Sequence, residues 1–226
     1  DIKILTKLKL DLKNSNLSQS KPTRIYNFIS NFLVFPVFRF LFRGRIYGIE
    51  NVPKTGPLIV VANHGSHLDP PFLGHALGRQ VAFMAKAELF DIPILGSIIK
   101  ACGAYPVQRG ASDRKALRVA SSCLAEGHAI GIFLDGTRQI NGRINKPKSG
   151  AALLAARNQA CLLPVAIINS HRALSYKRIW PRFLPVHLRI GKPIPPPMSR
   201  RKLDLENTNI ELKLVINNLL DQGLLQ

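Results

Sequence analysis

The sequence predicts an α/β protein in which helices flank a mixed, mostly parallel sheet. From residue 45 onward, short apolar runs alternate with helical patterns, and this alternation is typical of parallel strands joined by helices. The chain has 226 residues, 46% of them hydrophobic, which suffices for one domain with a substantial core. Its 3 cysteines, and its 16 glycines and 16 prolines without a period, exclude a disulfide scaffold and a collagen-like protein.

The expected strands are continuous apolar runs bounded by turn residues, a pattern typical of strands buried on both faces. They occupy residues 58–62, 81–85, 129–134, 162–168 and 186–190. A turn rich in proline follows the last of these runs, at residues 193–197. The five runs together predict the sheet.

The expected helices lie between these runs. One covers residues 69–77 and has two prolines in its first turn, where the N–H that proline lacks has no intrahelical partner. A second is capped by Ser112 and ended by Gly127, and a third covers residues 149–158. The last helix has an apolar face made of Leu212, Val215, Ile216, Leu219 and Leu220.

The N-terminal part differs from the rest in composition. Residues 1–43 are interpreted as a basic, aromatic segment that associates with a membrane, and residues 44–226 as the main domain. Residues 24–47 are the most aromatic stretch, but Pro36 and Arg39 interrupt it, which disfavours a membrane-spanning helix. Aromatic residues flanked by arginines are typical of a helix lying in the membrane interface. The alternative is a helix that packs in the core and is kinked at Pro36.

The charge is strongly positive, because 32 Lys and Arg face 13 Asp and Glu, for a net charge of +19. Residues 136–203 contain no acid at all. The partner is therefore expected to be anionic: nucleic acid, a membrane surface or a phosphorylated substrate. Nucleic acid is disfavoured, since no helix-turn-helix, RNA-binding or zinc-finger pattern occurs, and an anionic membrane is favoured. Cysteines without C-x-x-C spacing favour a reducing compartment, so we expect peripheral or monotopic membrane association on the cytoplasmic side.

A chemically active cluster directly follows the first apolar run, where residues 63–69 read Asn-His-Gly-Ser-His-Leu-Asp. Asp69 can accept the Nδ1–H of His64 and leave Nε2 as a general base, in a loop where α/β folds place their sites. Alternatively, Asp69 caps the next helix and His64 is an ordinary loop residue. A serine hydrolase is disfavoured because one loop cannot set Ser66, a histidine and Asp69 in triad geometry. A metal site is disfavoured for lack of zinc-ligand spacing.

Four motifs resemble the signature blocks of the glycerolipid acyltransferases, in the right order and spacing. The first block has the form His-x4-Asp, as residues 64–69 do. Residues 103–109 are similar to the second block, with the aromatic residue displaced relative to Arg109. Residues 133–138 resemble the third block, Phe-Pro-Glu-Gly-Thr-Arg, and residues 162–166 the fourth, an apolar run around a proline.

The resemblance implies an acyltransferase that transfers a fatty acyl group from an acyl thioester to the free sn-2 hydroxyl of 1-acyl-sn-glycerol 3-phosphate, giving phosphatidate for phospholipid synthesis. The thioester would be carried by acyl carrier protein or coenzyme A, and no metal or other cofactor is implied. His64, oriented by Asp69, would be the general base. The alternatives are an acyltransferase for another lysolipid, or a non-enzymatic basic protein that binds membranes or nucleic acid.

The resemblance also implies the substrate-binding residues. They are Lys86, Arg109, Asp135, Gly136, Thr137 and Arg138. Because a planar guanidinium binds phosphate oxygens two at a time, Arg109 and Arg138 are the candidates for the acceptor phosphate, with Lys86 adding a charge. Backbone N–H groups near Gly136 or in the Arg109 segment would stabilise the oxyanion that forms during acyl transfer.

The third block departs from the family pattern at two positions. Leu134 stands where proline is usual, and Asp135 where glutamate is usual. The carboxylate of Asp135 is one methylene shorter, so its reach changes by about 1.5 Å, which matters for precise positioning. We expect this substitution to affect acceptor preference or activity.

Overall fold

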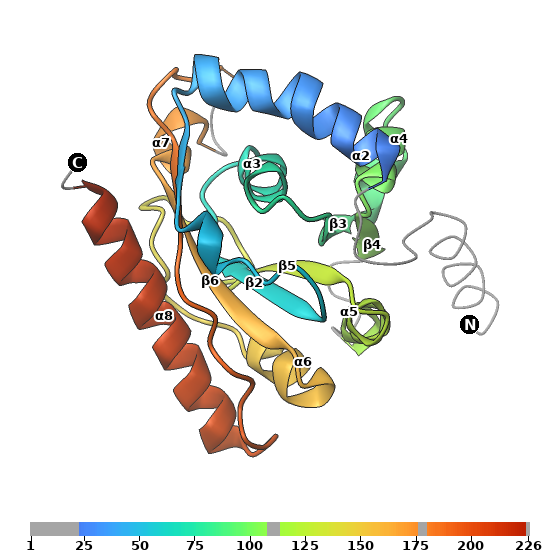
Figure 1. Cartoon of the computed structure of the whole chain (residues 1–226), viewed down its shortest axis with the longest axis vertical. Coiled ribbons are helices and arrows are strands. Elements are labelled where there is room, and N and C mark those ends of the chain that lie inside the picture. The colour runs from blue at the N-terminus through green and yellow to red at the C-terminus, as the bar shows by residue number, and fades with distance from the viewer. Residues whose placement is uncertain (1–22, 108–113, 176–179, 225–226) are drawn as a thin grey trace.

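The computed structural model describes residues 23–107, 114–175 and 180–224. Seven described strands form one sheet in the order β1-β7-β6-β2-β5-β3-β4. Their bounds are β1 Arg45–Tyr47, β2 Leu58–Ala62, β3 Val81–Lys86, β4 Tyr105–Val107, β5 Ala129–Phe133, β6 Cys161–Ile168 and β7 His187–Ile190. Neighbouring strands pair in parallel except β6 and β7, which are antiparallel. The predicted mixed, mostly parallel sheet is confirmed (Figure 1).

Helices cover both faces of this sheet (Figure 1). The α-helices are α2 Arg24–Phe28, α3 Asp69–Ala76, α4 Leu95–Ala101, α5 Arg114–Ala125, α6 Gly150–Asn158, α7 Ser170–Ala173 and α8 Lys202–Leu224. Short 3-10 turns lie at η3 Ile49–Asn51 and η4 Ala87–Phe90, and π-helical stretches at η1 Ile29–Val34 and η2 Val37–Leu41. The expectation of helices on both sides of the sheet is therefore met.

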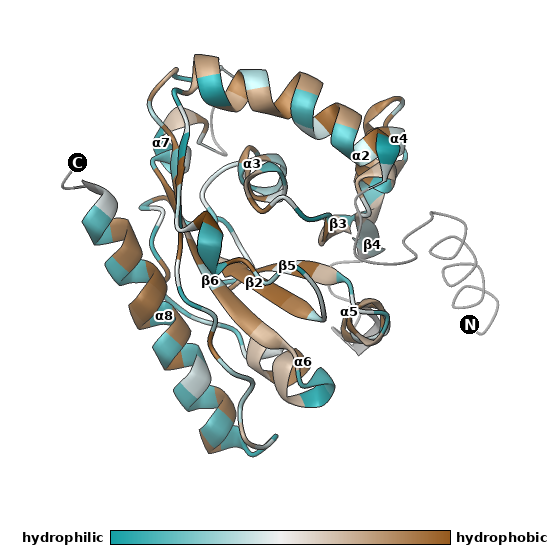
Figure 2. Ribbon diagram, in the orientation of Figure 1, coloured by the Kyte–Doolittle hydropathy of each residue, from teal (hydrophilic) through white to brown (hydrophobic). Residues whose placement is uncertain are grey.

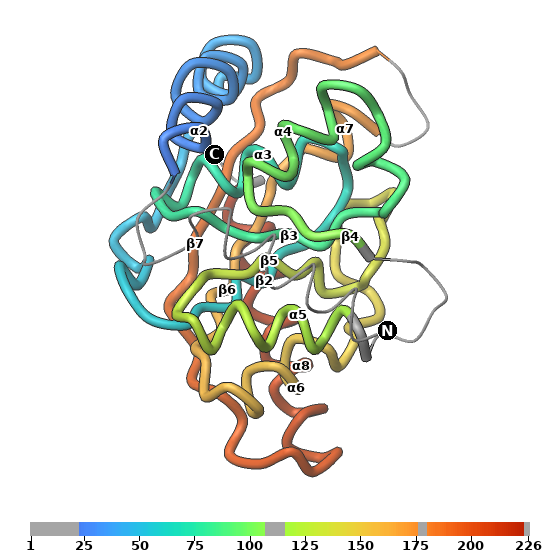
Figure 3. Tube along the Cα trace, turned by 90° about the vertical axis from the view of Figure 1, so that its right-hand side faces the viewer, coloured from blue at the N-terminus to red at the C-terminus, as the bar shows by residue number. Residues whose placement is uncertain are grey.

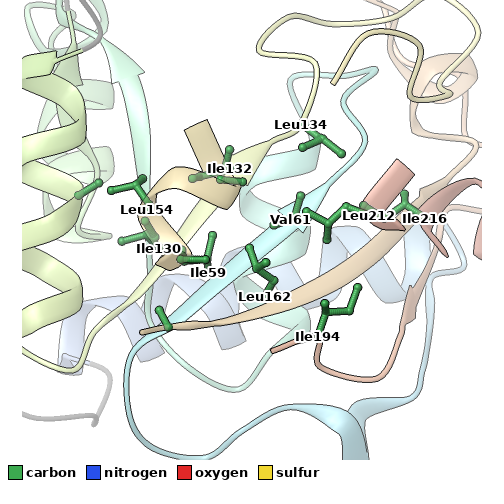
Figure 4. Packing of buried hydrophobic residues seen from close by; sticks show 14 of the residues in the cluster. Ile59, Val61, Ile130, Ile132, Leu134, Leu154, Leu162, Ile194, Leu212 and Ile216 are labelled. Carbon is green, nitrogen blue, oxygen red and sulfur yellow. The ribbon is translucent and has the colours of Figure 1, made fainter. Parts of the chain in front are cut away.

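Successive side chains of the central strand β2 enter two different cores, because strand residues alternate between the faces of a sheet. Ile59 and Val61 pack in a cluster with side chains of α5, α6 and α8 (Figure 4). Leu58, Val60 and Ala62 pack on the other face with side chains of α3. A strand that is buried on both faces must be apolar throughout, which explains the unbroken run that predicted it.

Several short elements were not predicted from the sequence, among them α7. The strands β1 and β4 have only three residues each, too few to give a recognisable apolar run, and α4 was not distinguished from the loops around it. The expected helix cap at Ser112 lies outside the described residues. Helix α5 ends at Ala125, shortly before Gly127, whose φ of 81° suits the glycine expected at this end.

The segments α2, η1 and η2 form one continuous helix, from Arg24 to Leu41, which we call the N-terminal helix (Figure 1). Pro36 lies between the two π-helical stretches. Bonding from residue i to i−5, as in the 5-residue step from Phe35 N–H to the Ser30 carbonyl, lets the helix continue around a residue that lacks an N–H.

One face of the N-terminal helix is fixed to α3. The hydroxyl of Tyr26 lies 2.8 Å from the carbonyl oxygen of Gly74 and 3.0 Å from that of Arg79, and burial raises its pKa. The rings of Phe38 and Phe42 meet the Phe72 ring edge-on, at centroid distances of 5.0 and 5.5 Å. The helix is therefore part of the second core of the domain.

The N-terminal helix also exposes large apolar side chains. They are Ile25, Phe28, Phe32, Leu33, Phe35, Phe40 and Leu41. Figure 2 shows this helix as alternating brown (hydrophobic) and teal (hydrophilic) bands. Phe32 and Phe40 are each 71% exposed, so core packing accounts for only part of this helix. Within residues 23–107, 114–175 and 180–224, no helix combines the length and the apolar character that crossing a membrane requires.

Candidate active site

The carboxyl end of β2 is held by a buried amide. The Nδ2 of Asn63 donates hydrogen bonds to the carbonyl oxygens of Gly142 at 2.7 Å and Ile167 at 2.9 Å, and its Oδ1 accepts one from the N–H of Ile167 at 2.7 Å. These bonds tie β2 to the end of β6 and to the loop that follows β5. The position of His64, the next residue, is thereby fixed by the sheet itself.

His64 and Asp69 form the predicted pair. The Nδ1 of His64 donates to Oδ2 of Asp69 at 2.8 Å, and the same oxygen accepts the N–H groups of Gly65 and Ser66, each at 2.8 Å. Asp69 is completely buried and its side chain makes no capping bond to α3, so the helix-cap alternative does not hold. The contact is confirmed, and it leaves Nε2 as the nitrogen suited to proton transfer. Its role in catalysis remains a prediction.

An aromatic ring fixes the plane of the His64 imidazole. Phe133 is stacked on it, with the ring centroids 3.9 Å apart and the planes 11° from parallel. Phe133 in turn stacks on Phe83, which needs the space that Gly131 leaves, since a Cβ there would lie 2.1 Å from that ring. No sequence pattern indicated this role of Phe133, although the residue opens the third block.

Leu134, the first departure in the third block, serves both the sheet and the core. Its N–H donates to the carbonyl oxygen of Ala62 at 3.0 Å, a bond that proline could not make. Its side chain is 1% exposed and packs in the same cluster as Ile59 and Val61 (Figure 4). The substitution therefore adds a bond between the ends of β5 and β2, beside His64.

Asp135, the second departure, is turned into its own loop. It is 5% exposed, and its two oxygens accept the N–H groups of Asn145 at 3.1 Å and Lys146 at 2.9 Å. The next residue, Gly136, has a φ of 67°, and its N–H donates to Phe133 at 2.9 Å. The N–H of Gly136 itself is thus used in the turn, and the expectation of oxyanion donors near this residue stays a prediction. Thr137 is exposed.

Arg138 is brought to the first block by His67, a histidine with no role predicted from the sequence. The guanidinium Nη1 of Arg138 donates to Nε2 of His67. Burial lowers the pKa of His67 below 6.5, and the nearby Arg138 and His64 lower it further, which favours the neutral imidazole that can accept this bond. The N–H of Gln139 also donates to the carbonyl oxygen of His64 at 2.7 Å. The first and third blocks therefore form one site.

His171 packs against the site loops from behind. A Cβ on Gly65 would lie 2.5 Å from the Cβ of His171, and a Cβ on Gly142 would lie 2.3 Å from its Nδ1. Burial lowers the pKa of His171, with a smaller contribution from Arg172. These three packed residues are 77 and 29 positions apart in the chain, so no local pattern could have revealed them.

Within the part of the chain that the structure describes, the side chains of the remaining candidates form no hydrogen bond with the histidine–aspartate pair. Lys86 is exposed at the end of β3, which is separated from β2 by β5. Arg109 lies outside the described residues. Ser66 is fully buried and its Oγ accepts the N–H of Leu68 at 3.1 Å, as expected of a loop residue. Among the described residues, no three His, Cys, Asp or Glu side chains are grouped so that they could hold a metal ion.

The fold and the site together define a class: an α/β protein with a histidine–aspartate pair at the carboxyl end of a central strand and an arginine-bearing loop beside it. Residues 43–168, more than half of the chain, match the sequence profile of the acyltransferase family. The chain belongs to the acyltransferase family.

Several named proteins are similar to it. The chain is 28% identical over 151 residues to the 1-acyl-sn-glycerol-3-phosphate acyltransferase of Borreliella burgdorferi, covering 64% of this chain and 59% of that protein. It is 33% identical over 124 residues to the protein of the same name from Bacillus subtilis, covering 54% and 61%. A chloroplastic protein of this name from Arabidopsis thaliana is 31% identical over 133 residues, covering 58% and 37%. The chain thus spans less than two thirds of the length of these relatives.

A solved structure supports the same grouping. The crystal structure of the 1-acyl-sn-glycerophosphate acyltransferase from Thermotoga maritima is similar with a TM-score of 0.67 and 28% sequence identity. The similarity covers 95% of this chain and 88% of that one. The likeness therefore includes the sheet and the helices on both of its faces.

Proposed function

We propose that this protein transfers a fatty acyl group from an acyl thioester to the sn-2 hydroxyl of 1-acyl-sn-glycerol 3-phosphate, giving phosphatidate. The observation that carries the proposal is the 2.8 Å hydrogen bond between His64 and Asp69, with the His64 ring stacked on Phe133. All three residues lie within the region that matches the family. The names of the relatives from Borreliella burgdorferi and Bacillus subtilis supply the acceptor. An acyltransferase acting on another lysolipid is the second candidate.

His64 acts as the general base in this reaction. Its Nε2 takes the proton of the acceptor hydroxyl while that oxygen attacks the thioester carbonyl carbon. The tetrahedral intermediate then collapses, the carbon–sulfur bond breaks, and the thiolate takes the proton from the imidazolium. Asp69 stabilises the imidazolium through its bond to Nδ1, and the Phe133 ring keeps the imidazole plane constant throughout. No cofactor is needed besides the thioester, carried by acyl carrier protein or coenzyme A.

The acceptor phosphate binds to the cationic side chains around this pair. Arg138 is the main candidate because its loop lies beside His64, and Arg109 and Lys86 are proposed to add to it. Asp135 contributes through the shape of the loop, since both its oxygens bind loop N–H groups. Thr137 is proposed to lie at the rim of the same site.

We propose further that residues 1–43 associate with an anionic membrane on the cytoplasmic side, while residues 44–226 form the catalytic domain. The exposed apolar side chains of the N-terminal helix support this arrangement. Because the same helix packs on α3, the catalytic domain would lie directly against the lipid surface. The acceptor could then enter without leaving the membrane interface. Association would be peripheral or monotopic.

The test is thiol release from an acyl thioester in the presence of lysophosphatidate, with the lipid product identified by its mass. His64→Ala is expected to lower the rate at least 10²-fold, an order of magnitude typical of general-base removal. His187→Gln, on β7, serves as the matched control and should keep its activity. Full activity of His64→Ala would refute the assignment of the base. Incubation with mixed lysolipids distinguishes the two candidate acceptors.

A further inference from the structure

A short segment far from the N-terminal helix in sequence exposes two large aromatic side chains. Residues 180–183 read Trp-Pro-Arg-Phe, and Trp180 is 83% exposed while Phe183 is 54% exposed. Trp180 is the only tryptophan of the chain. Exposed aromatic residues that lie close together, unlike single scattered ones, indicate an interaction surface for a protein, a ligand or a membrane.

This segment lies beside the carboxyl end of the N-terminal helix. The ring of Phe183 contacts the ring of Phe42, with centroids 5.7 Å apart, and the Nη2 of Arg43 donates to the carbonyl oxygen of Phe183 at 2.8 Å. On its other side, the N–H of Arg182 donates to the carbonyl oxygen of Ala173 at 2.6 Å. From residue 180 on, the chain runs next to this end of the helix in both Figure 1 and Figure 3. The segment is thus held in a fixed position.

Its apolar surface continues that of the N-terminal helix. Phe40 and Leu41, 71% and 47% exposed, directly precede Phe42, the residue that Phe183 contacts. Two chain segments about 140 positions apart therefore contact each other, and both expose large apolar side chains beside this contact. Neither α3 nor any other described element covers these side chains, since they are open to solvent.

The charge around this surface selects its occupant. The exposed arginines on the two segments are Arg24, Arg39, Arg43, Arg45 and Arg182. Residues 23–47 and 180–190 contain no Asp or Glu. Indole rings favour the headgroup region of a bilayer, and arginines are attracted to anionic lipids there. An anionic lipid bilayer meets both requirements.

We propose that residues 180–183 are a second membrane-contacting element, which places Trp180 and Phe183 in the headgroup region of an anionic bilayer beside the N-terminal helix. The inference rests on the membrane association put forward with the proposed function. Two separate points of attachment fix the tilt of the domain on the membrane. With one helix alone, the domain would be free to rotate about the axis of that helix.

This second contact is structurally joined to the site. Shortly before it in the chain, His171 packs against Gly65, and Ser175 forms a bridge with Ser66. Both contacts are made to the loop between His64 and Asp69. Anchoring the segment therefore orients the catalytic loop relative to the plane in which a lysolipid acceptor lies.

The test uses the intrinsic fluorescence of Trp180 in the full chain. Vesicles of phosphatidylglycerol and phosphatidylcholine should shift the emission to shorter wavelength, and brominated lipids should quench it. Vesicles of phosphatidylcholine alone should have a weaker effect.

The matched control places the single tryptophan elsewhere. In a Trp180→Phe background, Met198→Trp places the indole in the segment between β7 and α8. That segment leads into the start of α8, at the end of the molecule away from the N-terminal helix (Figures 1 and 3). Met198 is completely exposed, so its indole should stay in water.

A second variant measures the contribution to binding. Phe183→Ser should weaken partitioning to the anionic vesicles about three- to tenfold, as expected for removing one partly inserted aromatic side chain. Met198→Ser, which removes an equally exposed apolar side chain elsewhere, should leave partitioning unchanged. Thermal denaturation of Phe183→Ser confirms that the domain remains folded.

Other outcomes overturn the inference. If the protein sediments with vesicles while Trp180 emission stays at its value in water, residues 180–183 do not touch the bilayer, but the proposed function stands. If no vesicle binds the protein, both the inference and the proposed membrane association fail, whereas acyl transfer is judged by thiol release. If the Trp180 emission shifts to shorter wavelength without vesicles, either at higher protein concentration or on addition of acyl carrier protein, the surface binds a protein partner instead.

Discussion

The bond between Arg138 and His67 depends on one proton. His67 accepts this bond only as a neutral imidazole, and its lowered pKa, caused by burial and by Arg138 and His64, favours that neutral form. Asp69 nearby acts in the opposite direction. When the pH falls through the lowered pKa, His67 becomes charged, loses the acceptor and repels Arg138. The positioning of the proposed phosphate ligand is therefore sensitive to acid.

We predict that the apparent KM for lysophosphatidate rises as the pH is lowered from 7.5 to 5, while the KM for the thioester changes much less. His67→Gln provides the control, because an amide oxygen accepts a hydrogen bond from Arg138 at every pH. In that variant the acceptor KM should lose most of its pH dependence. Steady-state kinetics with each substrate varied in turn measures both. If the acceptor KM of His67→Gln depends on pH as it does in the unmodified protein, His67 does not control the position of Arg138.

Asp135 offers a second test at the level of a single residue. Asp135→Asn replaces one of the two acceptor oxygens by an NH₂ group, which then faces the N–H of Asn145 or Lys146. Leaving a buried donor unpaired should lower the free energy of unfolding by about 1–3 kcal/mol, and the acceptor KM should rise as the loop loosens. Asp135→Glu keeps both oxygens but adds a methylene to a site only 5% exposed, so it should also destabilise, through overpacking. An unchanged Tm in both variants would mean that the Asp135 carboxylate is not held in the loop by the N–H groups of Asn145 and Lys146.

At the scale of elements, the site depends on close approach between loops that come from three different strand ends. The loop after β2 contributes Gly65, the loop after β5 contributes Gly142, and α7 after β6 contributes His171. A side chain on either glycine would collide with His171. The geometry of the His64 loop is therefore set by packing from behind as well as by the bond to Asp69.

We predict that Gly142→Ala destabilises the protein by more than the 1–2 kcal/mol expected for a residue with Cβ at its φ of 67°. Gly56→Ala is the matched control, since Gly56 has a φ of 82° but no heavy atom within 4 Å of a Cβ. The excess cost in Gly142→Ala should shrink when combined with His171→Ala, giving a coupling energy of about 0.5–3 kcal/mol. Denaturant titrations of the four members of the cycle measure it. Additive effects would mean that the ring of His171 does not fill this space.

For the whole molecule, five of its six histidines share one electrostatic feature. Burial is the largest cause that lowers the pKa of each one below 6.5. They are His67, His75, His128, His171 and His187. Because unfolding returns each pKa to about 6.5, the unfolded chain binds more protons than the folded one when the pH lies near and below that value. The stability that the neutral histidines provide is thus present above about pH 6.5 and is lost as the pH falls through the folded pKa values.

We predict that the Tm decreases steadily between pH 7.5 and 5. Each kcal/mol lost should correspond to roughly 2–4 °C for a chain of this size. Asp221, whose pKa is lowered from 3.8 by its bond to Arg143, titrates below this range and does not contribute. His187→Gln should reduce the slope. Differential scanning calorimetry at several pH values tests this, and a Tm that is constant or rises on acidification would refute it.

The sequence revealed those features whose cause is local. The run at residues 58–62 predicted β2 because a strand buried on both faces has no polar positions. The contact between His64 and Asp69 could be predicted because the two residues share one short loop. By contrast, β1 and β4 were missed because three residues carry no periodic signal, and their pairing with β7 and β3 comes from the sheet.

By itself, then, the sequence determined the α/β class, the histidine–aspartate pair and the family, since each depends on short segments and their order along the chain. Only the tertiary structure decided that Phe133 stacks on His64, that His67 binds Arg138, and that residues 180–183 lie against the end of the N-terminal helix. These contacts link positions tens of residues apart, and their energies depend on distance and burial, which become defined only when the sheet has brought its strand ends together.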